Sequence, residues 1–186
     1  REVERLKPSQ IVHLATIGDE GKLDSIEQLQ ETQERGVLSL MHLIRAIQNT
    51  GLEGGIEIVL VSPYVNEVDG KEQYIHPENA TLFGLGKVIE REYPNILCRC
   101  IDIDQNVKAK DILTELKQSR RSNSAYRGST RYIEEFGETK VEDIPDKQVD
   151  IKDTGAYIIT GGTGGIGLEI ARYLAAQNRV NLVLLS

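Results

Sequence analysis

The sequence is poor in cysteine and in long apolar runs. Its 186 residues contain no tryptophan, one methionine, two phenylalanines and two cysteines. Two cysteines cannot form a disulfide framework, and the i,i+2 spacing of Cys98 and Cys100 suits a strand better than a metal site. No apolar run approaches the ~20 residues of a membrane-spanning helix, and the charged start Arg1–Arg5 lacks a signal-peptide core. These absences predict a cytoplasmic protein without a membrane partner.

The charge balance excludes another class of partner. Lys and Arg total 22 and Asp and Glu total 29, which gives a formal net charge of −7. A nucleic-acid-binding protein needs a basic face to displace counterions from phosphates, so no nucleic-acid partner is expected. An apolar content of 39% is enough for one sizeable domain or two small ones. Because the chain begins without Met and stops inside an apparent strand, we expect it to be a piece of a larger protein.

The first two thirds of the chain alternate between short apolar runs and segments of helical period. Strands are predicted over 10–17, 56–61 and 96–103, and helices over 24–51, 76–94 and 111–119. Such alternation, with runs this apolar, predicts a parallel sheet covered by helices. A small hairpin is expected within 65–74 around the Asp69-Gly70 turn, and one or two short strands within 126–136.

The segment 138–154 changes character and suggests a boundary. It is highly charged, contains one proline and has little periodicity, which is typical of a crossing between two units. We therefore predict a first domain over 1–150 and a second over 151–186.

A glycine-rich turn in the second part is the most informative motif. The apolar run 156–160 leads into Gly161-Gly162-Thr163-Gly164-Gly165-Ile166-Gly167, and a helical pattern and a second apolar run, 180–185, follow. Glycines let a ligand approach the backbone closely, and the free N–H groups of the following helix favour a pyrophosphate. The spacing fits both the general dinucleotide motif and its Thr-Gly-x-x-x-Gly-x-Gly variant. The alternative is a loop that only turns the chain.

The chain resembles the ketoreductase domain of modular polyketide synthases, a member of the short-chain dehydrogenase superfamily, and the related fatty acid synthases. The resemblance is tightest over 157–175 and 182–186, the glycine turn, its helix and the next strand. It extends to 11–14, to 80–94 with the strand 98–104, and to 126–133.

The resemblance implies an α/β fold in two parts. The first part is a truncated Rossmann-like structural subdomain that binds no cofactor, and the second is the first β-α-β of a Rossmann catalytic subdomain. It also implies NADPH as cofactor and, as substrate, a β-ketoacyl chain held on the phosphopantetheine arm of an acyl carrier protein, beside neighbouring synthase domains of antibiotic biosynthesis. The expected cofactor-binding residues are Thr160, Gly161, Gly162, Thr163, Gly164, Gly165, Ile166, Gly167 and Ser186.

Catalytic residues are not expected in this chain. Short-chain reductases use a Tyr as proton donor, with a Lys or Asn four positions on, and none of the seven tyrosines has this spacing. The side chain that selects NADP lies ~20 residues past the turn, directly after Ser186. We therefore expect the chain alone to be an inactive part of the reductase. A noncatalytic bracing or docking module with a vestigial turn, and an unrelated short-chain dehydrogenase, remain alternatives.

Other polar residues are given structural interpretations. His13 is expected to be a hydrogen-bonded core histidine, His42 and His76 to have no special role, and Cys98 and Cys100 to be buried thiols. The pair Gly84-x-Gly86 is expected to permit close helix packing. One basic cluster is expected to be a solvated face, with docking of an acyl carrier protein as the alternative: Lys117, Arg120, Arg121, Arg127 and Arg131.

Overall fold

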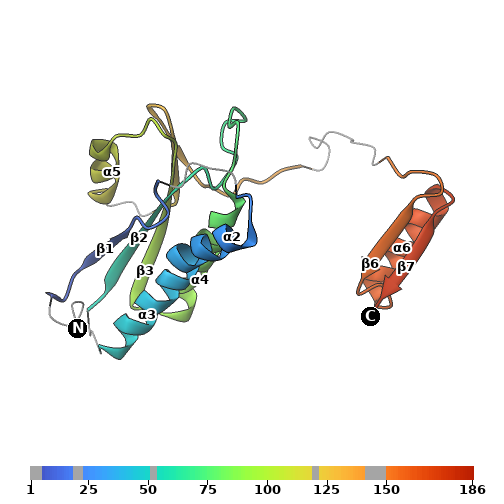
Figure 1. Cartoon of the computed structure of the whole chain (residues 1–186), viewed down its shortest axis with the longest axis horizontal. Helices are drawn as coiled ribbons and strands as arrows, with labels where there is room; N and C mark the ends of the chain where they lie inside the picture. Colours follow the sequence, from blue (N-terminus) through green and yellow to red (C-terminus); the bar gives the residue numbers. More distant parts are fainter. Residues whose placement is uncertain (1–5, 19–22, 51–53, 119–121, 141–149) are drawn as a thin grey trace. The chain divides into compact units, whose positions relative to one another are not determined.

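The computed structural model describes residues 6–18, 23–50, 54–118, 122–140 and 150–186. The chain divides into two compact units, Arg1–Phe136 and Gly137–Ser186, which we call unit 1 and unit 2 (Figure 1). The expected domain boundary at residue 150 stays a prediction, because residues 141–149 of the predicted linker lie outside the described part.

Unit 1 contains a five-stranded sheet in the order β1-β2-β3-β4-β5. Strands β1 (Gln10–His13), β2 (Ile56–Pro63), β3 (Ile96–Ile103) and β4 (Ser124–Arg127) run parallel, and β5 (Thr130–Ile133) pairs antiparallel with β4. The helical elements are α2 (Ile26–Gln33), the π-helical η1 (Glu34–Leu38), α3 (Ser39–Asn49), the 3₁₀ turn η2 (Pro77–Asn79), α4 (Ala80–Glu92) and α5 (Ala109–Leu116). The predicted α/β class is confirmed.

Alternating side chains of β2 and β3 form two separate cores. Ile58 and Leu60 point toward α3 and α4, where they pack with Leu40 and Ile44. Val59 and Ile101 point to the opposite face, where partly buried side chains of α5 cover them. Helices α3 and α4 therefore cover one face of the sheet and α5 the other (Figure 1).

Two sequence predictions for unit 1 are wrong in detail. The first strand ends at His13 rather than at residue 17, because the chain turns there and Ile17 N–H donates to the Leu14 carbonyl at 3.1 Å. No hairpin forms within 65–74, where bends replace strands, although Gly70 has the positive φ of 74° that the Asp69-Gly70 turn predicts. The segment 126–136 does provide a strand pair, β4 and β5.

Of the two glycines in α4, only Gly86 is required by close packing. A Cβ on Gly86 would lie 2.6 Å from Leu60 Cδ1 and within 3.3 Å of both cysteine sulfurs, whereas a Cβ on Gly84 would meet nothing within 4 Å. Gly86 therefore lets α4 approach the sheet. Cys98 and Cys100 are free thiols on that face, and burial raises the pKa of Cys98 to about 12 and that of Cys100 as well. The interpretation as a buried thiol is confirmed for Cys100, whereas Cys98 is only partly buried.

The described part of unit 2 forms one β-α-β unit. Strand β6 (Ala156–Thr160), helix α6 (Gly165–Gln177) and strand β7 (Asn181–Leu185) follow in order, and the two strands pair parallel from Ala156↔Asn181 to Thr160↔Leu185. Gly167 and Ala171 of α6 are buried, while Ile166 and Tyr173 are exposed by 81% and 59%. The strand-turn-helix-strand order predicted from the glycine motif is confirmed.

Candidate functional site

The glycine turn lies between the carboxyl end of β6 and the start of α6. Gly161 has a φ of 68°, which residues with a Cβ rarely adopt. A Cβ on Gly162 would lie 2.7 Å from the Ile159 carbonyl oxygen, and one on Gly167 would lie 2.6 Å from Gly162 Cα. Three of the five glycines are therefore required by the fold of the turn itself.

Gly165 has a different role from these three. A Cβ at this position would meet no protein atom within 4 Å, so the chain's own packing does not require a glycine there. Gly165 is the first residue of α6, and an absent side chain leaves open the space in front of the helix. This is the arrangement that a bound group close to the backbone would need.

The start of α6 presents unpaired hydrogen-bond donors to this space. The first helical N–H groups have no acceptor within a helix, and no hydrogen bond within the described part of the chain takes the N–H of Gly165 or Ile166. Because α6 has 13 residues, the aligned peptide dipoles add positive potential at this end. The turn therefore has the donors and the clearance that suit a diphosphate.

Ser186 is brought to the same edge by strand pairing. Thr160, the last residue of β6, is paired with Leu185, and Gly162 N–H donates to the Leu185 carbonyl at 2.8 Å. Ser186 follows directly. The residues predicted to bind the cofactor thus lie together at the carboxyl edge of the β6–β7 pair.

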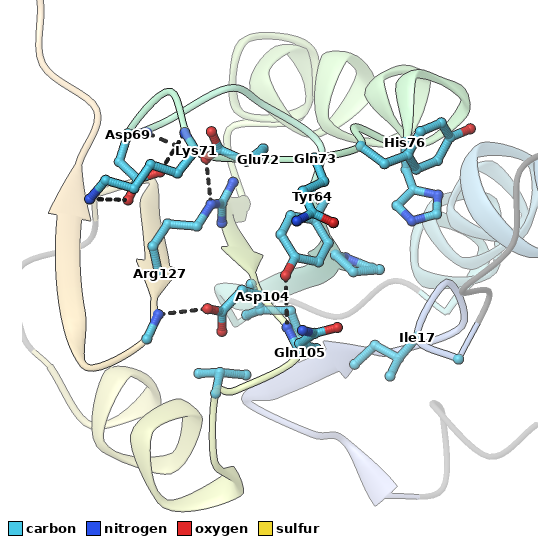
Figure 2. Close-up of a pocket in the computed structure, with 16 residues that line it drawn as sticks. Ile17, Tyr64, Asp69, Lys71, Glu72, Gln73, His76, Asp104, Gln105 and Arg127 are labelled. Atoms are coloured by element: carbon cyan, nitrogen blue, oxygen red, sulfur yellow. Dashed lines mark hydrogen bonds and ion pairs between the residues drawn. The ribbon is translucent and has the colours of Figure 1, made fainter.

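Unit 1 has a pocket of about 810 Å³ at the carboxyl edge of its own sheet. Residues that follow β2 and β3 line it, with Arg127 and Gly128 from the end of β4. Figure 2 shows Arg127 and His76 on opposite sides, with Tyr64 between them. Sequence analysis did not identify this pocket, because its lining comes from segments far apart in the chain.

Arg127 is an internal residue, so the expected solvated face is wrong at this position. It is 8% exposed, and its guanidinium donates to Glu72 at 2.7 Å and to Asp102 at 3.1 Å. It also donates to the Asn66 carbonyl at 2.8 Å and lies 5.2 Å from the centre of the Tyr64 ring. A buried arginine needs such partners because an unpaired charge is costly to bury.

Arg131 is also engaged within unit 1. Its Nε and Nη2 each donate to Glu115 at 2.6 Å, and the Glu115 side chain is fully buried. Neither Arg127 nor Arg131 is therefore available as part of the docking face considered for an acyl carrier protein. Lys117 is exposed, and Arg120 and Arg121 lie outside the described residues.

Hydrogen bonds keep the pocket carboxylates ionised. Burial opposes ionisation of Glu72, but bonds from Arg127 and from the N–H groups of Val68 and Asp69 outweigh it and lower its pKa to about 2. Burial likewise opposes ionisation of Asp104, and bonds from the Gly128 N–H and from Asn106 lower its pKa. The pocket therefore carries stable negative charges.

The histidines differ from expectation in one case. His13 is 9% exposed and its Nε2 lies 2.7 Å from Ser39 Oγ, which confirms a hydrogen-bonded core histidine. His76, expected to have no special role, is buried beside the pocket, with Nδ1 2.8 Å from Glu78 Oε1. In the sequence, the only local indication of this pair was that Glu78 follows His76 by two positions.

Two kinds of site were not found in the described residues. No group of three or more His, Cys, Asp or Glu side chains lies close enough together there to hold a metal ion. Among the same residues, no helix is both long and apolar enough to cross a membrane.

Comparison with known families gives two matches along the chain. Residues 2–119 match the family described as beta-ketoacyl synthase-like, N-terminal, and residues 155–186 match the KR domain. The chain is 26% identical over 165 residues to polyketide synthase PksL of Bacillus subtilis, which covers 86% of this chain and 3% of that protein. It is 29% identical over 117 residues to a phenolphthiocerol/phthiocerol polyketide synthase of Mycobacterium tuberculosis, covering 58% of this chain and 6% of that protein.

Solved structures give the same result. A keto acid-selecting NRPS module with adenylation, ketoreductase and pseudo Asub domains aligns with a TM-score of 0.80 and 27% identity, over 95% of this chain and 15% of that one. An A-type ketoreductase from a modular polyketide synthase aligns with a TM-score of 0.58 and 26% identity, over 76% of this chain and 30% of that one. The chain thus spans only a small part of the proteins it matches. It belongs to the beta-ketoacyl synthase-like N-terminal family and, with its KR-domain match, is part of a ketoreductase of the modular polyketide synthase kind.

Proposed function

We propose that the chain provides the structural part and the diphosphate-binding turn of a reductase that acts with NADPH. The substrate would be the β-keto group of an acyl chain held on an acyl carrier protein. The observation that carries this proposal is Gly165, where open space meets two unpaired N–H groups at the start of α6. A turn that only reversed the chain direction would not need a glycine at this position.

The residues of the turn would hold the cofactor by its diphosphate. Gly165 and Ile166 would donate their N–H groups, and Ser186 would lie beside the adenosine ribose, at the end of the neighbouring strand. When bound, NADPH supplies the hydride that reduces the ketone.

Protonation of the resulting alkoxide needs an acid that this chain does not carry in the expected motif. None of its seven tyrosines has a Lys or Asn four positions on. We therefore propose that unit 1 supports the catalytic part and that the chain by itself does not turn over substrate. Incubation with NADPH and a simple β-keto thioester is expected to leave the absorbance at 340 nm unchanged.

Titration of NADPH against the intact chain tests the turn. We expect weak binding that a Gly165→Val variant reduces at least tenfold, because the new side chain fills the space in front of the N–H groups. Gly137→Val is the matched control, since a Cβ there also meets nothing within 4 Å and Gly137 belongs neither to the turn nor to α6. If Gly165→Val binds NADPH as well as the unchanged chain, the proposed role of the turn is wrong.

A further inference from the structure

The pocket of unit 1 lies where two neighbouring strands send the chain to opposite faces of the sheet. After β2 the chain continues to α4, and after β3 it continues to α5, which lies on the other face. Connections that diverge in this way leave a crevice at the carboxyl ends of the strands, the usual ligand position in open α/β sheets. The volume of about 810 Å³ is within the range of small-molecule sites.

His76 gives this pocket a specific hydrogen-bonding group. Its side chain is 5% exposed, and Nδ1 lies 2.8 Å from Glu78 Oε1. Since a carboxylate only accepts, Nδ1 carries the proton in the neutral ring, and Nε2 is left with its lone pair. No hydrogen bond within the described residues uses Nε2, and His76 lines the pocket. The pocket thus has an acceptor nitrogen that no described residue occupies.

Aromatic rings and a strained backbone surround this acceptor. The Tyr74 ring lies 4.9 Å from the His76 ring in an edge-to-face arrangement, and the Tyr64 ring lies at 6.5 Å. Tyr64 has a φ of 46°, which is unfavourable for a bulky residue. Its N–H donates to the Ile103 carbonyl, and its own carbonyl accepts from His76 N–H. Strain held by surrounding bonds is most common at ligand sites.

The charges of the pocket disfavour a phosphorylated ligand. The guanidinium of Arg127 is occupied by Glu72, Asp102 and the Asn66 carbonyl. The exposed Lys71 ammonium lies 3.6 Å from Asp69 Oδ2. The carboxylates of Glu72 and Asp104 remain ionised and would repel phosphate. An uncharged ligand fits this balance.

Asp104 adds a group that recognises hydroxyls. Its Oδ1 accepts from Asn106 N–H at 2.9 Å, and its Oδ2 accepts from Gly128 N–H at 2.6 Å and from Asn106 Nδ2 at 3.3 Å. Because a carboxylate offers about four acceptor positions, Oδ1 can accept one more hydrogen bond. A carboxylate just past a strand end is also the group that binds ribose hydroxyls in open α/β folds.

From these observations we propose that unit 1 binds an uncharged nucleoside in this pocket. The flat base would pack among the rings of Tyr64 and Tyr74, a donor on the base would bond to His76 Nε2, and a ribose hydroxyl would donate to Asp104. This inference goes beyond the proposed reductase function and does not depend on it, because the pocket lies wholly within unit 1.

Calorimetric titration of the intact chain tests the proposal. The probes are adenosine, guanosine, cytidine and uridine, with their 5′-monophosphates as a charged series. We expect at least one nucleoside to bind with a Kd below about 1 mM, which is about 4 kcal/mol of binding free energy, and its monophosphate to bind at least tenfold more weakly. A His76→Phe variant, which keeps a ring but removes Nε2, is expected to bind that nucleoside at least tenfold more weakly.

Two controls separate this site from other effects. His42→Phe changes an exposed histidine of α3 and is expected to leave nucleoside binding unchanged, and an NMR measurement on the unchanged chain is the second control. Since His76→Phe leaves Glu78 without its partner and can weaken the fold, the His76 Nε2 resonance of the unchanged chain is followed by ¹⁵N NMR and should shift as the nucleoside saturates. The proposal fails if no nucleoside binds, if the monophosphate moves the His76 resonance at the same concentration as the nucleoside does, or if the nucleoside leaves that resonance unmoved.

Discussion

At the scale of single residues, buried charged and histidine side chains connect the strands and helices of unit 1. Arg99 is 2% exposed and pairs with Glu57 at 3.0 Å, while its Nη1 donates to the Glu115 carbonyl at 2.9 Å. It thereby links β3 to β2 and to the end of α5. A buried charge with such partners is far costlier to disrupt than an exposed pair.

His13 makes the stability of unit 1 depend on pH. Its Nε2 donates to Ser39 Oγ, whose own proton is directed to the carbonyls of Arg35 and Gly36. Nδ1 is buried and has no partner in the described structure, so the charged ring is disfavoured, and burial lowers the pKa of His13 below 6.5. The unfolded chain therefore takes up the proton first, and the folded state loses stability as the pH falls through about 6.5.

Urea unfolding of the chain at pH 7.5 and pH 5.0 measures this effect. A His13→Gln variant cannot titrate, although its amide can still donate to Ser39. We expect the loss of unfolding free energy between the two pH values to be smaller in this variant than in the unchanged chain. Equal losses in both proteins would show that His13 does not contribute.

At the scale of elements, α4 depends on how closely it approaches the sheet. Gly86→Ala places a methyl group 2.6 Å from Leu60 Cδ1, and Leu60 is fully buried. Overpacking of this kind costs about 1–3 kcal/mol, partly offset by the better helix propensity of Ala. We expect a lower unfolding midpoint in urea.

Gly84→Ala is the matched control within the same helix. Its Cβ would meet nothing within 4 Å, so only the helix propensity changes, by up to about 1 kcal/mol in favour of the folded state. The critical result is that the two substitutions change the unfolding free energy in opposite directions. If both variants are stabilised, α4 does not pack as tightly on β2 and β3 as the structure indicates.

At the scale of the whole molecule, unit 1 carries its own core. Two buried clusters, one on each face of its sheet, contain residues of unit 1 alone. In unit 2, by contrast, apolar residues such as Ile158 and Ile166 are exposed by 69% and 81%. Because cooperative folding depends on buried apolar surface, the two units should differ in independent stability.

A chain shortened to residues 1–136 tests this difference. We expect it to unfold cooperatively on heating, with a midpoint within about 5 °C of that of the main transition of the full chain. Circular dichroism at 222 nm and calorimetry follow the transition. A shortened chain without a cooperative transition would show that unit 1 requires the rest of the protein.

The sequence alone determined the local pattern of this protein. Strand β3, helix α6 and the glycine turn follow from apolar periodicity and from glycine chemistry, which act between near neighbours in the chain. The early end of β1 and the absent hairpin were not predictable in this way, because they depend on which backbone groups find partners elsewhere.

Only the tertiary structure decided the roles of the charged residues. Arg127 and Arg131 are close to other basic residues in sequence, but the fold places Glu72, Asp102 and Glu115 around them. The fold likewise places His76 beside the pocket at the carboxyl edge of the sheet. Sequence spacing determines which side chains share one face of a helix or strand. Pairing between distant segments depends on burial, because an unpaired charge or donor costs free energy when it is buried.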